Sequence, residues 1–278
     1  MSDILNYKIY MDNLTSEWIV FIHGAGGSIK TWNFQINAFK KHYNILLIDL
    51  RDHGRSKNIQ PAYSRYNFDI VSKDILRVLD EENIDKAHFV TLSFGSVMMQ
   101  ALYKRRPDLV MKMVFIGGVF NANWSIKSFV HLARFLNLFL SYQRMYQVFS
   151  YLLIPKKEHQ PARRIYQQQA RTLGAKEYLR WLGLYSEFFL LLKSFHRQPV
   201  HNPMLILMGE YDYIFLPSAC KFSGEKHFAE LKLIRDAGHI CNIDKPAETN
   251  QAILDFLDNP KQTTKKQQTR AQSDTSLF

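Results

Sequence analysis

Short apolar runs alternate with amphipathic segments over the first and last parts of the chain. Near-continuous apolar runs bounded by Gly or Asp predict buried strands at 18–23, 45–49, 88–92, 113–116 and 204–208, and LKLI predicts a further short strand at 231–234. Helical spacing lies between them: Asn67 can cap a helix, a second helix at 94–105 stops before Pro107, and Pro246 suits the first turn of a last one. This alternation predicts an α/β fold with a mostly parallel, doubly wound sheet.

The alternation stops between residues 120 and 199. This segment is rich in aromatic residues, Leu and Arg, has no strand pattern, and shows helical spacing, for example at Phe129, Leu132, Leu136 and Phe139. We therefore expect residues 120–199 to form an all-helical cap inserted in a core made of residues 1–119 and 200–259. The polar segment 260–278 is expected to be a disordered basic tail.

Length and composition fit one large globular domain with an insertion. The chain has 278 residues, of which 46% are hydrophobic, and its mean hydropathy is −0.24. It has no apolar run of about 18 residues, so stable membrane insertion is not expected. The first residues do not resemble a signal peptide. Cys220 and Cys241 are expected to be reduced packing residues, which makes the cytoplasm the default compartment.

The net charge of +11 is unevenly distributed. Residues 121–200 hold twelve Lys and Arg against three Glu and no Asp, and the segment from Pro260 holds four against one Asp. Because the rest of the chain is close to neutral, no nucleic-acid-binding surface is predicted and the expected partner is a small-molecule substrate. The basic side chains of the cap could simply face solvent. They could also attract an anionic substrate, an acidic partner protein or an anionic membrane surface.

The segment VTLSFGS, residues 90–96, follows a predicted strand and begins a helix. A nucleophilic serine needs a hydroxyl clear of the main chain, which a sharp strand-to-helix turn of the pattern Gly-x-Ser-x-Gly provides. Here Ser93 is followed by Gly95 but preceded by Thr91, which is larger than the usual Gly and should add strain. The alternative is that Ser93 only caps the next helix.

The segment HGAGG, residues 23–27, follows another predicted strand. A Gly-rich loop there can direct a main-chain N–H at a developing oxyanion, with the N–H of Phe94 as the second donor. The absence of a Walker lysine and of GxGxxG argues against nucleotide binding. We expect His23 to hold the loop, and DLRDHGRS to form a tight turn with Asp52 in a left-handed conformation.

Two later loops supply a candidate base and its acid partner. Asp212 lies in MGEYD after one predicted strand, and His239 lies in AGHICNIDKP after another. Activation of a hydroxyl requires a base within hydrogen-bond reach, itself oriented by a third group. Ser93, Asp212 and His239 also occur in the chain order expected for this fold. The alternative for Asp212 is a solvated acid in a turn.

Together, HGAGG, DLRDHGRS, TLSFGS, GEYD and GHICNIDKP resemble the α/β-hydrolase superfamily, in its branch with a helical cap, over about residues 5–258. The resemblance implies Ser93 as nucleophile, Asp212 as acid and His239 as base, with oxyanion N–H donors at Ala25 and Phe94. A serine nucleophile argues against the haloalkane dehalogenases and epoxide hydrolases of the superfamily, which use Asp there.

The expected function is cleavage of a carboxylic ester or thioester with a small apolar acyl or aromatic group, through an acyl-enzyme on Ser93. No metal or organic cofactor is expected. Two alternatives remain open: a ligand sensor or binding module on the same fold, and a C–C bond hydrolase or lyase that uses the same serine.

Overall fold

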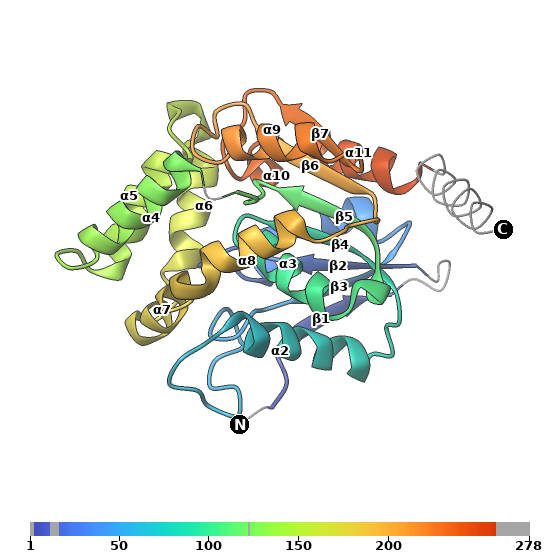
Figure 1. Cartoon of the computed structure of the whole chain (residues 1–278), viewed down its shortest axis with the longest axis horizontal. Helices are drawn as coiled ribbons and strands as arrows, with labels where there is room; N and C mark the ends of the chain where they lie inside the picture. The colour runs from blue at the N-terminus through green and yellow to red at the C-terminus, as the bar shows by residue number, and fades with distance from the viewer. Residues whose placement is uncertain (1–2, 12–16, 122, 260–278) are drawn as a thin grey trace.

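The computed structural model describes residues 3–11, 17–121 and 123–259, which fold around one seven-stranded sheet (Figure 1). The order of the strands across the sheet is β1-β3-β2-β4-β5-β6-β7. Their bounds are β1 Tyr7–Tyr10, β2 Trp18–Ile22, β3 Asn44–Ile48, β4 Ala87–Leu92, β5 Val110–Ile116, β6 Met204–Gly209 and β7 Ala229–Ile234. All pairs from β3 to β7 are parallel, so the predicted mostly parallel sheet is confirmed.

The strand at the edge of the sheet is absent from the sequence-based prediction. β1 pairs with β3 in the antiparallel direction, with Tyr7 opposite Ile48 and Tyr10 opposite Ile45. Its side chains are half-buried or exposed, whereas β3 is buried throughout. A short edge strand of this kind has no continuous apolar run, and only its pairing partner defines it.

Helices lie between the parallel strands and after the last one. They are α1 Ile36–Phe39, α2 Phe68–Glu81, α3 Gly95–Arg105, α9 Leu216–Glu225, α10 Cys241–Asp244 and α11 Pro246–Leu257, with 3-10 turns at Ile29–Trp32 and Pro107–Leu109. Three of them, α2, α3 and α11, stand where the spacing predicts. The Asn67 side chain accepts a hydrogen bond of 2.8 Å from the Ile70 N–H, so the predicted helix cap is present. α11 begins at Pro246, as expected.

Between β5 and β6, the described residues form helices and no strand. These helices are α4 Trp124–Leu136, α5 Tyr142–Leu153, α6 Gln160–Ala170, α7 Ala175–Leu182 and α8 Tyr185–Arg197, with a 3-10 turn at Lys157–His159. We call residues 120–199 the cap. In Figure 1, α4 to α7 gather beside the sheet, while α8 returns over it and packs on α3.

The helical spacing noted at the start of the cap is that of α4, in which Phe129 and Leu136 pack against the core. The buried side chains of α4 are Ile126, Val130 and Ala133. Leu132 is exposed, and Phe139 lies beyond the end of the helix with 71% of its surface accessible. Apolar residues lie on two sides of α4, and periodicity alone does not indicate which side turns inward.

Polar contacts hold the cap against the loops at the carboxyl ends of the strands. In α7, the Arg180 guanidinium lies 2.8 Å from the Asp52 carboxylate. The neighbouring Trp181 indole N–H donates to the Arg51 carbonyl at 3.1 Å. Both partners belong to the loop after β3, so α7 is bound to the core directly above the site described below.

The positive charge of the cap lies mainly on its surface. Ten of its twelve Lys and Arg side chains are exposed, while Arg163 is buried and Arg180 is half-buried. The basic tail predicted at 260–278 lies outside the described residues. Among the helices that the structure describes, none has both the length and the hydropathy needed to cross a bilayer.

Candidate active site

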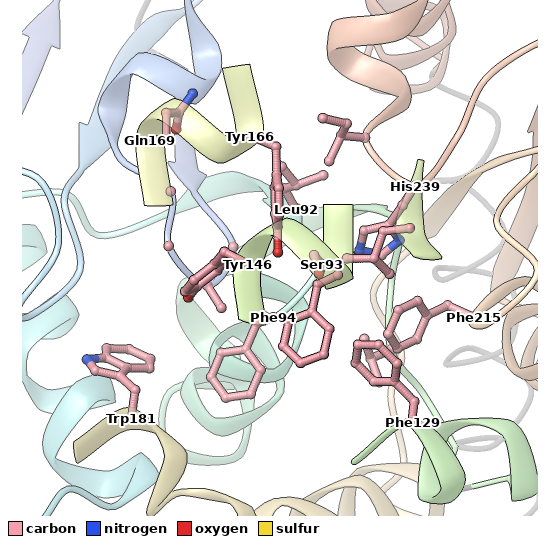
Figure 2. A pocket seen from close by; sticks show the side chains of 18 of the residues that line it. Leu92, Ser93, Phe94, Phe129, Tyr146, Tyr166, Gln169, Trp181, Phe215 and His239 are labelled. Atoms are coloured by element: carbon pink, nitrogen blue, oxygen red, sulfur yellow. Dashed lines mark hydrogen bonds between the residues drawn. The ribbon is translucent and has the colours of Figure 1, made fainter. Parts of the chain in front are cut away.

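Ser93 sits on a sharp turn between β4 and α3. Its φ angle is 51°, in the left-handed region that a non-glycine residue seldom adopts. A Cβ atom at Gly95 would lie 2.5 Å from the Ile22 carbonyl oxygen and 2.7 Å from that of His23, so only glycine fits there. The turn therefore forms as predicted and directs Ser93 into a cavity (Figure 2).

Thr91 is accommodated where the usual pattern has glycine. It is a buried residue of β4, paired with Ile22 on one side and Phe115 on the other. Its hydroxyl donates to the Val114 carbonyl at 3.3 Å. The β-branched side chain thus packs as an ordinary strand residue, and the turn at Ser93 is formed with Thr91 in place.

The structure brings Ser93, His239 and Asp212 together from three loops. The distance from His239 Nε2 to Ser93 Oγ is 2.7 Å, and that from His239 Nδ1 to Asp212 Oδ2 is 2.6 Å. The Phe215 N–H donates to Asp212 Oδ1 at 3.1 Å, which fixes the carboxylate. His239 and Asp212 are each 1% exposed, so water does not compete for these hydrogen bonds.

Gly117 makes room for the histidine, and sequence reasoning did not identify it. It follows β5 with a φ angle of 56°. A Cβ atom there would lie 2.7 Å from the His239 carbonyl oxygen and 2.9 Å from the ring atoms Cε1 and Nδ1. The signal in the sequence was a glycine pair directly after an apolar strand, which many turns share.

The two expected oxyanion donors, Ala25 and Phe94, line the cavity together with Ser93. Within the described chain, their main-chain N–H groups donate to no other group. A Cβ atom at Gly24 would lie 3.0 Å from the Leu92 carbonyl and 3.1 Å from Ser93 Cβ. The loop after β2 therefore rests directly on the turn at Ser93.

Two buried histidines hold this loop. His23 donates from Nδ1 to the Gly24 carbonyl at 2.8 Å and accepts at Nε2 from the Leu50 N–H at 3.0 Å. His53 accepts from the Gly26 N–H at 3.0 Å. Burial lowers the pKa of His23 to about 4 and that of His53 to about 3, so both rings are neutral near pH 7. The expected structural role of His23 agrees with these contacts.

The DLRDHGRS segment is also a structural turn. Asp52 has a φ angle of 67°, the left-handed conformation expected for it. The Asp49 carboxylate accepts from the Ile29 N–H at 2.7 Å and from the Arg55 N–H at 2.9 Å. Neither carboxylate lines the cavity of Ser93, so their charges serve the turn and the cap rather than the reacting group.

The cavity above Ser93 is lined mainly by apolar and aromatic side chains from both the core and the cap. Figure 2 shows several of them around Ser93 and His239. No Lys, Arg, Asp or Glu among the described residues lines it; its aromatic lining is Phe94, Phe129, Phe149, Phe188, Phe215, Trp181, Tyr146, Tyr166, Tyr178 and Tyr185. A site of this composition suits an apolar, uncharged ligand.

A Ser–His–Asp relay at the carboxyl ends of parallel strands, under a helical insertion, is the arrangement expected of a hydrolase with an α/β core. The family described as alpha/beta hydrolase fold matches residues 17–246 of the chain, and the protein belongs to this family.

Curated relatives include hydrolases. The chain is 29% identical over 115 residues to a candidate esterase/lipase of Haemophilus influenzae, which covers 41% of this chain and 39% of that protein. It is 29% identical over 111 residues to an (E)-2-((N-methylformamido)methylene)succinate hydrolase of Acinetobacter baylyi, covering 40% of this chain and 41% of that one. The chain thus spans about two fifths of the length of these relatives.

Solved structures share the fold over most of the chain. An N-acyl homoserine lactone degrading enzyme superposes with a TM-score of 0.76 at 21% identity, covering 91% of this chain and 96% of the other. A meta-cleavage product hydrolase from Pseudomonas fluorescens IP01 has a TM-score of 0.73 at 18% identity, covering 91% and 93%. At such identities the likeness shows the fold alone.

Proposed function

We propose that the protein is a serine hydrolase that cleaves a carboxylic ester or thioester through an acyl-enzyme on Ser93. The observation that carries this proposal is the continuous hydrogen-bonded relay from Ser93 Oγ through His239 to Asp212, with distances of 2.7 and 2.6 Å. Hydrogen bonds of these lengths let the imidazole take the serine proton without any rearrangement of the three side chains.

In the first half-reaction, Ser93 Oγ attacks the carbonyl carbon while its proton passes to His239 Nε2. Asp212 keeps the Nδ1 proton in place and stabilises the imidazolium that forms. The main-chain N–H groups of Ala25 and Phe94 donate to the oxyanion, and each such donor contributes about 3 kcal/mol of transition-state stabilisation. The C–O or C–S bond then breaks, and the leaving group takes its proton from His239.

In the second half-reaction, water attacks the acyl carbon on Ser93 and gives its proton to His239. The tetrahedral intermediate collapses, Ser93 Oγ recovers a proton from Nε2, and the carboxylic acid leaves. The apolar lining of the cavity favours an acyl or aromatic group without charge. An anionic headgroup would have to remain outside, where the exposed basic side chains of the cap lie.

Covalent labelling tests the nucleophile. A fluorophosphonate should modify the native protein at Ser93, and p-nitrophenyl esters of increasing chain length should be hydrolysed. Ser93→Ala should remove both labelling and turnover, whereas Ser223→Ala, a change in α9 outside the cavity, should leave both unchanged. A folded protein that is not labelled, or a Ser93→Ala variant with the original rate, would contradict the proposal.

The same experiment separates the alternatives. Labelling without turnover of any ester or thioester would favour a ligand sensor. Labelling with hydrolysis of a C–C bond next to a ketone, and with no ester turnover, would favour the C–C bond hydrolase.

A further inference from the structure

Four consecutive cap helices each place one tyrosine in the wall of the cavity above Ser93. They are Tyr146 of α5, Tyr166 of α6, Tyr178 of α7 and Tyr185 of α8. The ring centroid of Tyr146 lies 5.8 Å from that of Tyr166 and 6.0 Å from that of Tyr178. Figure 2 shows Tyr146 and Tyr166 projecting into the cavity on which Ser93 opens.

Tyr146 connects this cluster to the loop that carries the Ala25 N–H. A Cβ atom at Gly26 would lie 2.8 Å from Tyr146 Cε1 and 2.9 Å from its hydroxyl oxygen, so the polar end of the ring rests against the loop. Tyr146 is 6% exposed and Tyr178 is 7% exposed. The phenol groups are therefore enclosed with the reacting centre rather than spread over the cap surface.

The four hydroxyl groups have no hydrogen-bond partner within the described residues. Burial raises the pKa of each phenol, and for three of the four, neighbouring tyrosines raise it further. Burial raises the pKa of Tyr178 to about 12 and that of Tyr146 well above its ordinary value, so both are neutral donors. These hydroxyl groups line the cavity and are not among the fully buried unpaired polar atoms of the described chain, so each can donate to whatever fills the cavity. Several such donors facing one cavity favour a ligand that carries a hydrogen-bond acceptor at this wall.

The charge of the lining restricts what that ligand can be. Within the described chain no Lys, Arg, Asp or Glu lines the cavity, so an ionised group at the tyrosines would be buried without a counter-charge. A neutral oxygen avoids this cost and still accepts hydrogen bonds from phenol groups. A purely hydrocarbon chain would leave the hydroxyls unpaired.

We propose that Tyr146, Tyr166, Tyr178 and Tyr185 form a subsite for a neutral oxygen, such as a keto or hydroxyl oxygen, on the apolar acyl part of the substrate. This inference rests on the proposed serine hydrolase function and narrows its substrate class to oxygenated acyl esters. The tyrosines position the acyl group by hydrogen bonds and take no part in proton transfer.

Matched esters test the subsite. The kcat/KM of the full-length protein is measured on p-nitrophenyl hexanoate and on its 3-oxo, 4-oxo and 5-oxo analogues, each rate corrected for spontaneous hydrolysis. At least one oxo ester should be preferred by about tenfold or more, the factor expected from a buried hydrogen bond. Tyr146→Phe and Tyr166→Phe should reduce that preference, because each should lower kcat/KM more on the oxo ester than on hexanoate, mainly through KM.

Tyr151→Phe is the matched control, because Tyr151 also lies on α5 but is 60% exposed. It should keep the preference of the native protein. Equal kcat/KM for hexanoate and all oxo esters in the native protein, or a preference that survives both Tyr146→Phe and Tyr166→Phe, would overturn the subsite.

A binding measurement separates this failure from a failure of the proposed function. Calorimetry on Ser93→Ala with methyl hexanoate and its oxo analogues should show tighter binding of an oxo ester, and loss of that difference when Tyr146→Phe is added. Selective binding without any turnover by the native protein would overturn the hydrolase function and keep the subsite. Turnover without selective binding would overturn the subsite and keep the hydrolase.

Discussion

At the residue scale, single glycines and strained dihedral angles place the side chains of Ser93 and His239. Ser93 adopts a φ angle of 51°, and glycine is the only residue type that fits at position 95, against the Ile22 and His23 carbonyls. Gly117 leaves space for the His239 ring in the same way. The strands that precede Ser93 and Gly117, β4 and β5, are buried almost throughout, so the packing around them can hold this strain. The geometry of the hydrogen-bonded relay thus depends on two glycines that are not members of it.

Gly117→Ala should move His239 and slow catalysis. The added methyl group would overlap the His239 ring at 2.9 Å and would strain a φ angle of 56°. A misplacement of about 1 Å can cost about 100-fold in rate, so kcat/KM on a p-nitrophenyl ester should fall by about that factor. Gly224→Ala is the control, because a Cβ atom there meets nothing within 4 Å, and its kcat/KM should match the native value. Native activity in Gly117→Ala would argue against this role.

Asp212→Asn should leave the fold intact and reduce kcat. The amide can still accept from the Phe215 N–H, but it favours the wrong imidazole tautomer and cannot stabilise the imidazolium. We expect kcat to fall by about 10³ to 10⁴ with the melting temperature changed by only a few degrees. Asp108→Asn, at an exposed carboxylate remote from the cavity, should have no effect on kcat. A fall of less than about tenfold would exclude Asp212 as the acid partner.

At the element scale, the loops after β2 and β3 are held by neutral histidines, and the cap is held by the loop after β3. His53 accepts from the Gly26 N–H, and Arg180 of α7 pairs with Asp52. The loop after β2, the turn after β3 and the cap are therefore linked through a few side chains. Each of these links predicts a change in stability that can be measured apart from activity.

Acid should destabilise the protein through His23 and His53. Their pKa values are about 4 and about 3 in the folded protein, against 6.5 in an unfolded chain. Below pH 6.5 the unfolded chain binds protons that the folded one does not, so the free energy of unfolding falls as the pH falls. The limit is about 1.4 kcal/mol per pH unit for each histidine.

Urea unfolding at a series of pH values from about 7 to about 5 measures this slope. His53→Asn should reduce the dependence of the unfolding free energy on pH by the contribution of about one proton, whether or not the variant is less stable overall. His42→Asn, at an exposed histidine, should leave the slope unchanged. An unaltered slope in His53→Asn would show that His53 titrates alike in both states.

Arg180→Gln should loosen the cap. The change would leave the Asp52 carboxylate, which is 3% exposed, without the charge that faces it from α7. The free energy of unfolding should fall by about 1–3 kcal/mol, and the amide hydrogens of α7 should exchange faster than in the native protein. Arg171→Gln, at an exposed arginine of the same cap, should change neither. Unchanged exchange in α7 of Arg180→Gln would show that other contacts hold the cap.

At the scale of the whole molecule, charge and apolar surface are separated. The cavity has no Lys, Arg, Asp or Glu among its described lining residues, while ten of the twelve Lys and Arg of the cap are exposed. The exposed Lys and Arg can therefore attract a substrate only while it approaches, or through a substrate group that stays outside the cavity. Salt distinguishes these two regions because it screens exposed charges much more than buried contacts.

Turnover of a neutral ester should be insensitive to salt, and binding of an anionic thioester should not. Between about 0.02 M and about 0.5 M NaCl, the KM for a short p-nitrophenyl ester should stay constant, whereas the KM for an acyl-CoA of equal chain length should rise several-fold. Lys176→Gln together with Arg171→Gln, two exposed charges of the cap, should reduce that rise. Equal salt dependence for both substrates would exclude a role for the basic cap surface in substrate attraction.

Local patterns determined the order of the elements and the identity of the relay. Near-continuous apolar runs predicted five of the seven strands because buried parallel strands have no polar face, and the short LKLI segment marked a sixth, β7, which is partly exposed. Asn67 and Pro246 marked helix starts because caps act over three or four residues. Ser93, Asp212 and His239 could be named because each follows a predicted strand and parallel strands end at one edge of the sheet.

Only the tertiary structure decided which residues surround that relay. The edge strand β1 depends on its pairing with β3, and the inward face of α4 depends on what it packs against. The place of Gly117 behind His239 depends on two loops that are distant in sequence. The four tyrosines lie on separate helices and meet only because the cap folds over the sheet. Sequence periodicity describes one element at a time, whereas a cavity is formed between elements.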